Sequence, residues 1–237
     1  MSRTVRVAAA MAALSFVVGC ASPEIPYDRS GAGSVHTIGV LTPDIPEKPS
    51  VILASDPGQS FGLIGGLVDV SLQLKRDDKL YAILLGHHYT VGQSLSADLV
   101  TALQAQGFNV KPIAVSRDSS GFLKTYPTEP GIDAYLDVSS FPDGFGYAAA
   151  GIGSSQPYRP FVWLKVKLVR ASDGSVLMQD TVMYNPIGTN DKWVTVSPDP
   201  AYQFEDFDTL TGHADLSVKG VDVSLRQTAD QVGKLLR

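Results

Sequence analysis

The strongest structural signal in the chain is residues 161–184, where apolar and polar side chains alternate in two runs that flank a turn at residues 172–174. Alternation of this kind is typical of β-strands with one buried face. A three-residue loop with Gly174 in the left-handed conformation sets Leu168 opposite Met178, which sorts the apolar side chains from the polar ones. The same register pairs Leu164 with Val182 and Lys167 with Gln179. We therefore predict a long antiparallel hairpin.

Further strands are predicted where β-branched residues are bounded by glycine or proline. They cover residues 35–41, 51–54, 110–116 and 132–138. Helices are predicted at residues 94–106, with Asp98 in the first turn, and at the C-terminus. The apolar face of the terminal helix consists of Val218, Val221, Leu225, Ala229, Val232 and Leu236.

Residues 60–85 admit two interpretations, because residues 68–75 alternate like a strand whereas the longer segment gathers its apolar side chains on one helical face. We favour the helix. Gly62, Gly65 and Gly66 would each cost about 1 kcal/mol relative to alanine there, so we expect them to pack closely against the sheet. A glycine zipper inserted in a membrane is disfavoured, since the unbroken apolar sequence is far shorter than a span.

Together these elements predict an α+β fold. We expect a single mixed sheet of about five or six strands, with helices packed on one side and a C-terminal helix. Residues 34–237 are predicted to form one domain, preceded by residues 20–33, whose prolines, charges and small residues suit a flexible tether.

The N-terminal segment has the pattern of a secretory signal peptide. Arg3 and Arg6 supply a positive start, and residues 7–18 form an uncharged apolar run. Because crossing the hydrocarbon core takes about 20 apolar residues, this run indicates a signal over residues 1–19 and not a permanent span.

The four residues Val17-Val18-Gly19-Cys20 resemble the lipobox of bacterial lipoproteins. The resemblance implies lipidation of Cys20, with cleavage just before it and further acylation, such as palmitate, at the new N-terminus. Two or three acyl chains anchor a protein stably, whereas one gives marginal binding. Ala21 in place of aspartate implies an outer-membrane location facing the periplasm. The alternative is an ordinary thiol near a plain cleavage site.

Composition excludes several classes of function. The chain carries a net charge of −5, and removing the two arginines of the signal leaves about −7, which argues against a nucleic-acid partner. Cys20 is the sole cysteine, so neither a disulfide within the domain nor a cysteine metal site is expected.

The order of elements also resembles a fold of periplasmic lipoproteins, shared by the soluble domain of the curli-secretion lipoprotein and the N-terminal domain of the Tol-system translocation protein. The residues that carry this resemblance are the strand at Val35, the segment Gln104-Ala105-Gln106-Gly107-Phe108-Asn109-Val110, and Gly131-Ile132-Asp133-Ala134-Tyr135-Leu136. It implies an architecture and no set of functional residues. A ring-forming export subunit would also need an inserted membrane hairpin, for which residues 68–74 are the weak candidate.

One motif favours an enzyme. Gly58-Gln59-Ser60-Phe61-Gly62 matches the G-x-S-x-G nucleophile elbow, which needs several strands upstream and a histidine downstream. His213 is the histidine placed far enough along the chain. A lipid-anchored serine hydrolase using Ser60 and His213 is therefore the alternative hypothesis, against a glycine-rich loop entering a helix.

Other candidates for chemistry are weaker. His87 and His88 are adjacent, so their side chains diverge, and a metal site would need a further ligand such as His36. Asp77 and Asp78 sit among alternating charges, which favours a solvated turn or helix face over catalytic carboxylates. We expect no metal and no cofactor.

Aromatic residues near the predicted strands suggest a surface for a partner. Tyr147, Tyr158 and Arg159 lie in segments that look like exposed loops, and aromatic and arginine side chains are good interface anchors. The alternative is that they fold back on the sheet edge. The favoured hypothesis is a non-catalytic, outer-membrane-anchored lipoprotein that contacts the membrane through Cys20 and binds a protein of the envelope.

Overall fold

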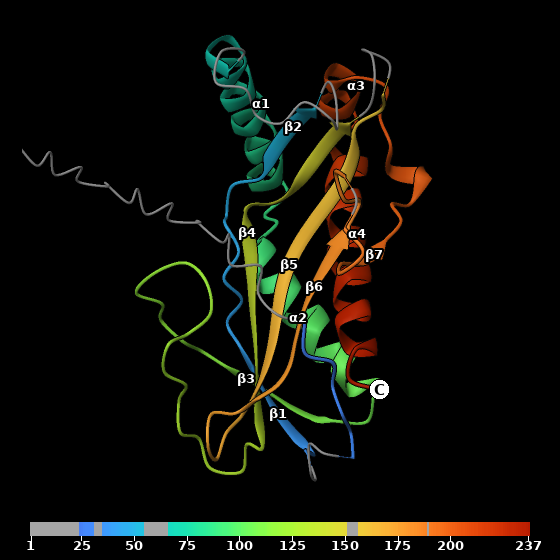
Figure 1. Cartoon of the computed structure of the whole chain (residues 1–237). Coiled ribbons are helices and arrows are strands. Elements are labelled where there is room, and N and C mark those ends of the chain that lie inside the picture. Colours follow the sequence, from blue (N-terminus) through green and yellow to red (C-terminus); the bar gives the residue numbers. More distant parts are fainter. Residues whose placement is uncertain (1–23, 31–34, 55–65, 151–155, 189) are drawn as a thin grey trace, which may run out of the picture.

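The computed structural model of the chain describes residues 24–30, 35–54, 66–150, 156–188 and 190–237. These residues form a seven-stranded mixed sheet with helices (Figure 1), so the predicted α+β class is confirmed. The strands are β1 (Thr37–Leu41), β2 (Ser50–Ala54), β3 (Asn109–Ile113), β4 (Ala134–Ala150), β5 (Arg159–Arg170), β6 (Val176–Tyr184) and β7 (Val194–Val196). The helices are α1 (Gly66–Gly86), α2 (Val91–Gln104), the 3₁₀ helix η1 (Pro200–Tyr202), α3 (Phe207–Gly212) and α4 (Ala214–Lys234).

The long strand β4 is the centre of the sheet, whose order is β3-β1-β4-β5-β6-β7. Its first residues pair in parallel with β1 and its last residues pair in parallel with β2, while β5 runs antiparallel along its other edge. Between Ser140 and Phe145 the pairing with β5 shifts register. Gly144 in this bulge has a φ of 57° and lies so close to Pro46 that a Cβ would overlap the proline ring.

The predicted hairpin is confirmed in its register. Leu168 pairs with Met178, Leu164 with Val182, and Lys167 with Gln179. Gly174 has a φ of 73°, the left-handed conformation that was expected. The loop is one residue longer than predicted, because a bulge next to Leu168 lets the amide of Arg170 donate to Ser175 across a four-residue turn.

Helices α1, α2 and α4 lie on one side of the sheet, as expected (Figure 1). The predicted apolar face is confirmed at four positions of α4, since Val221, Leu225, Ala229 and Val232 are buried in the main core, and Leu236, just after the helix, is buried there as well. Gly233 brings α4 against the backbone of Ala102 in α2, where a Cβ would lie 2.9 Å from the carbonyl oxygen. The helix layer thus depends on small residues at its contacts.

Two expectations about the elements are wrong, and a third is confirmed in part. Helix α2 begins at Val91, so Asp98 lies in its middle and not in its first turn. Strand β4 continues to Ala150, whereas residues 144–147 were interpreted as loop, because the bulge interrupts the alternating pattern. The helical interpretation of residues 60–85 is confirmed from Gly66 onward, and the residues before it lie outside the described part of the chain.

The sheet face opposite the helices carries a second, smaller apolar cluster. It is built on Leu41, Ile132 and Tyr135 and is covered by side chains of the connection between β3 and β4. We call residues 114–131 of this connection the strap. The strap crosses from one parallel strand to another and returns to the sheet at β4.

Residues 24–30, predicted to belong to a flexible tether, instead contact the sheet. Ile25 forms an antiparallel bridge with Gln179 on the outer edge of β6, and Tyr27 packs against the main core. In the described part of the chain, no helix is both long and apolar enough to cross a membrane.

Candidate functional site

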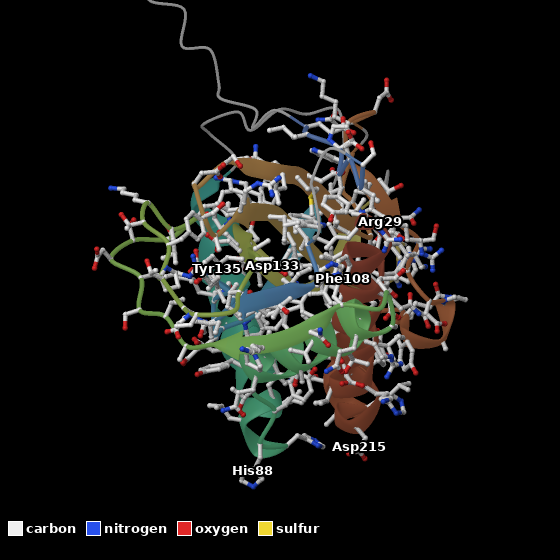
Figure 2. The ribbon with its side chains drawn as sticks, turned by 90° about the horizontal axis from the view of Figure 1, so that it is seen from below. Arg29, His88, Phe108, Asp133, Tyr135 and Asp215 are labelled. Carbon is white, nitrogen blue, oxygen red and sulfur yellow. The ribbon has the colours of Figure 1, made fainter. Side chains whose placement is uncertain are left out.

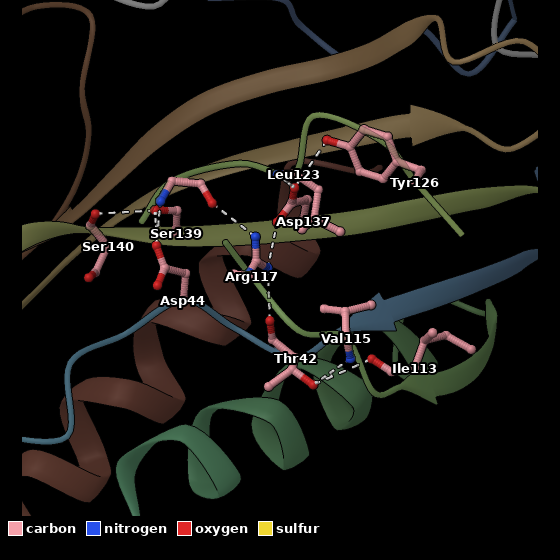
Figure 3. Close-up of polar contacts among 11 residues, drawn as sticks. Thr42, Asp44, Ile113, Val115, Arg117, Leu123, Tyr126, Asp137, Ser139 and Ser140 are labelled. Atoms are coloured by element: carbon pink, nitrogen blue, oxygen red, sulfur yellow. Dashed lines mark hydrogen bonds and ion pairs between the residues drawn. The ribbon is translucent and has the colours of Figure 1, made fainter. Parts of the chain in front are cut away.

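The strap is held to the sheet by Asp137, a fully buried carboxylate near the start of β4. One carboxylate oxygen accepts a hydrogen bond of 2.8 Å from the guanidinium of Arg117. The other accepts from the amide of Leu123 at 2.8 Å and from the hydroxyl of Tyr126 at 3.0 Å. All three donors belong to the strap (Figure 3). Asp137 therefore satisfies its charge with strap groups, as a buried carboxylate must.

Arg117 connects the strap to a second strand. Its side chain is 10% exposed, and its guanidinium also donates to the carbonyl oxygens of Gly121 at 2.9 Å and Thr42 at 2.8 Å. Its Nε is buried and has no hydrogen-bond partner among the described residues. The ion pair with Asp137 is thus part of a network that joins β4, the end of β1 and the strap.

Asp44 extends the network along β4. Its carboxylate accepts from the amide of Gly121 and, at 3.1 Å, from the hydroxyl of Ser139. The backbone of Asp44 also pairs with β4, since its amide donates to Val138 and its carbonyl accepts from Ser140. The strap is therefore fixed at Gly121 as well as at Arg117.

An aromatic pair lies beside this network and also joins the strap to β4. The ring of Tyr126 stacks on that of Tyr135, with centroids 6.2 Å apart and planes 18° apart. Burial, reinforced by the neighbouring carboxylate of Asp137, raises the pKa of the Tyr126 hydroxyl above its usual value. The phenol stays protonated and donates its hydrogen bond across the whole physiological range.

A second carboxylate secures the end of the strap. Asp133 accepts hydrogen bonds of 2.8 Å from the amides of His36 and Thr37, at the start of β1. Partial burial would raise the pKa of Asp133, but these two amide bonds outweigh it and lower the pKa below its usual value. The hydroxyl of Tyr135 accepts from the amide of Glu129. Asp133 and Tyr135 lie side by side at this end of the molecule (Figure 2).

This geometry holds the strap in a fixed position on the sheet. Asp137 and Arg117 form hydrogen bonds with one another and with backbone groups, so neither side chain points into solvent. The outward positions of the strap are polar and exposed, namely Asp118, Ser119, Ser120, Lys124, Thr125 and Thr128. A rigidly held, solvent-facing loop is a common place for binding residues.

Sequence reasoning did not identify this cluster, although one signal was present. Asp137 interrupts the apolar run of β4 at a position that alternation places on the same face as Tyr135 and Ser139, and all three side chains are buried. A carboxylate in such a strand needs a cationic or amide partner. The position of that partner, 20 residues earlier in the chain, is set by the path of the strap.

The predicted exposure of Tyr147 and Tyr158 is wrong. The ring of Tyr147 is fully buried under α4, with an edge contact to Phe204 at 5.6 Å between centroids. Tyr158 is 5% exposed and packs 6.1 Å from Phe207. Both were interpreted as loop residues, but they lie on or beside strands that η1, α3 and α4 cover. Arg159 is half-buried, and its contact with a partner stays a prediction.

The remaining candidates are dispersed. Cys20 and Ser60 lie outside the described residues, so neither lipidation nor a Ser60–His213 pair is tested by the geometry. His213 is exposed between α3 and α4. His87 lies 3.6 Å from Asp215, and His88, at the margin of the molecule in Figure 2, has a left-handed φ of 52° at the end of α1.

Asp77 is also not in a solvated position. It is 8% exposed, and its carboxylate accepts a 2.7 Å hydrogen bond from the amide of Val51, which joins α1 to β2. Its neighbour Asp78 is exposed and pairs with Lys48. Among the described residues, no group of three or more histidine, cysteine, aspartate or glutamate side chains is arranged to hold a metal ion.

Neither a protein family model nor a curated protein matches the chain. Similar solved structures include a Xanthomonas campestris protein described by the family DUF330, with 14% identity, coverage of 92% of this chain and 88% of that chain, and a TM-score of 0.43. A putative neuraminyllactose-binding hemagglutinin homologue of Helicobacter pylori has 10% identity, coverage of 86% and 87%, and a TM-score of 0.37. The PelC dodecamer of Paraburkholderia phytofirmans, in a variant, has 11% identity, coverage of 82% and 88%, and a TM-score of 0.28.

Proposed function

We propose that the chain is a lipid-anchored envelope protein that binds another protein through the strap and catalyses no reaction. The observation that carries this proposal is the way Asp137 holds the strap, through three donors that lie within it. A carboxylate with 0% exposure is costly to bury. Here the three hydrogen bonds that offset this cost also hold an exposed, polar loop in one conformation. A loop held in this way favours recognition by a partner.

The anchor in this proposal is the lipobox at Cys20. Acylation there would hold the domain at the outer membrane, facing the periplasm. Growth with labelled palmitate, followed by mass spectrometry of the purified N-terminal peptide, tests it directly. We expect label and acyl mass on the natural chain and neither on Cys20→Ser. An unmodified, free cysteine in the natural chain would contradict the anchor.

The strap surface is tested by photocrosslinking in intact cells. Photoreactive side chains at Ser119 and Thr128 are compared with one at Thr101, which is also exposed but lies on α2. We expect a discrete crosslinked protein from the strap positions and none from Thr101. Asp137→Ala should weaken the strap crosslinks, because it frees the strap from the sheet.

Equal crosslinking from the strap and from Thr101, or none from the strap in fully acylated protein, would contradict a binding role for the strap. The hydrolase alternative is then examined with a fluorophosphonate probe on the natural chain and on Ser60→Ala. Labelling that depends on Ser60 would replace the binding proposal with an enzymatic one.

A further inference from the structure

The segment just after the proposed lipid anchor is bound to the domain. The amide of Ile25 donates to the carbonyl of Gln179 at 2.8 Å, and the amide of Gln179 donates back at 2.9 Å. Tyr27 packs against the main core, and the guanidinium of Arg29 lies 5.9 Å from the centroid of Phe108 (Figure 2). The segment that begins at residue 24 is therefore fixed to the outer edge of β6.

This attachment leaves a short connection to the membrane. Ile25 is the fifth residue after Cys20, and a fully extended chain spans at most about 3.5 Å per residue, or roughly 17 Å over these five steps. The step rests on the proposed function, because it takes Cys20 as the acylated residue. With the acyl chains in the bilayer, the edge of β6 near Gln179 lies within about 20 Å of the headgroups.

The sheet face next to this point combines cations with aromatic rings. Lys167 is directly opposite Gln179 in the sheet, and Lys165 is opposite Thr181. The ammonium of Lys167 lies 4.1 Å from the ring centroid of Phe122, and that of Lys165 lies 4.5 Å from that of Phe141. Half-buried Trp163 follows on the same face of β5. We call Trp163, Lys165 and Lys167 the β5 cation face.

The charges on this face favour an anionic surface. The six residues that pair on this face of β5 and β6 are Trp163, Lys165, Lys167, Gln179, Thr181 and Met183, and they include two cations and no acid. Asp137, which lies directly opposite Lys167 in β4, is already bound to Arg117 and to two strap groups. These cations stand out in a chain whose net charge is −5.

We propose that the β5 cation face lies against the anionic headgroups of the membrane in which Cys20 is anchored. A lysine near an anionic bilayer contributes about 1 kcal/mol, and tryptophan is enriched at the membrane–water interface. The short connection from Ile25 brings this face to the bilayer, and the lysines orient it. The helix layer then faces away from the membrane.

Spin labelling of the full acylated chain tests this orientation. The sulfur of Cys20 carries the lipid, so a single introduced cysteine can be labelled specifically. Nitroxides at Thr181→Cys, on the cation face, and at Thr101→Cys, on α2, are compared in vesicles of phosphatidylethanolamine and phosphatidylglycerol that contain a nickel-chelating lipid. We expect the nickel headgroups to enhance relaxation several-fold more at Thr181 than at Thr101.

Two further measurements separate the lysines from the short connection. Lys165→Glu with Lys167→Glu should reduce the contrast between the two labels, whereas Lys75→Glu with Lys234→Glu, the same change of charge at exposed helix positions, should not. In the unmodified sequence, raising the salt concentration from 50 to 500 mM should reduce the contrast as well, since screening weakens exposed charge pairs. This second test does not depend on the folding of a variant.

Equal relaxation at Thr181 and Thr101, or a contrast that neither charge reversal nor salt reduces, would overturn the proposed membrane contact. Mass spectrometry of the same preparation shows whether Cys20 is acylated. An acylated protein without the contrast contradicts the orientation alone, whereas an unacylated protein contradicts the proposed function.

Discussion

The hydroxyl of Tyr147 donates a 2.9 Å hydrogen bond to the carbonyl oxygen of Ser217, and so joins the last residues of β4 to the first turn of α4. The bond is buried. It is possible because Gly220, one turn further along α4, leaves room for the phenol, and a Cβ on Gly220 would overlap the hydroxyl. A tyrosine and a glycine thus set the distance between helix and sheet.

Gly220→Ala should lower the free energy of unfolding by about 1–3 kcal/mol, the usual cost of overpacking a core, although alanine is the better helix former. Urea denaturation measures the change. Gly86→Ala is the control, because a Cβ there meets no atom within 4 Å. Tyr147→Phe removes the hydroxyl, so Gly220→Ala should cost less in that background. Equal costs in both backgrounds would show that the hydroxyl is not the obstacle.

Asp77→Ala should destabilise the protein by about 1–3 kcal/mol, the cost of leaving a buried amide without its partner. The amide is that of Val51, and α1 would lose its link to β2. Asp78→Ala is a matched control, since its side chain is 71% exposed and surface ion pairs contribute little. Hydrogen exchange at Val51 should accelerate in the first variant and not in the second.

Asp137→Ala should cost about 3–5 kcal/mol, because it leaves the guanidinium of Arg117 buried without its counter-ion. The double variant Arg117→Ala with Asp137→Ala should be less destabilised than the sum of the two single variants. Limited trypsin digestion gives an independent measurement, since the released strap should be cut at Lys124. Asp118→Ala, an exposed position of the strap, should leave both measurements unchanged. Additive single effects would contradict a direct coupling.

The spacing of apolar and polar residues predicted the elements whose structure depends mainly on neighbouring residues in the sequence. The register of the hairpin followed from alternation around Gly174, and α4 followed from the helical spacing of its apolar residues. Strand β4 was cut short because its bulge at residues 141–144 contains proline and glycine and resembles a turn. In that case tertiary pairing on both sides overrides the local signal.

The candidate site was not predictable in the same way. Arg117 lies in the strap, Thr42 directly after β1 and Asp137 near the start of β4, and nothing in the spacing of these residues indicates that they meet. The bridge between Ile25 and Gln179 was missed for a similar reason, because a segment rich in proline and charge resembles a linker. Contacts between segments far apart in the sequence depend on the order of the strands in the sheet, and local sequence patterns do not determine that order.

Stability should depend on pH through Asp98 on α2. Burial, and then the nearby carboxylate of Asp222, raise the pKa of Asp98 to about 6, and its buried Oδ2 has no hydrogen-bond partner among the described residues. Arg226 and Lys219 oppose this shift, and Asp230 adds to it.

In the unfolded chain the pKa of Asp98 returns to its usual value near 4. Between about pH 4 and pH 6 the folded protein therefore binds more protons at this site than the unfolded chain, and its stability falls as the pH rises. Asp98→Asn removes the ionisation, so it should stabilise the protein by about 1 kcal/mol at pH 7.5, a value reduced for solvent screening, and change little at pH 4.5. Urea midpoints at the two pH values measure this. A gain of equal size at both would show that packing, and not the charge of Asp98, is responsible.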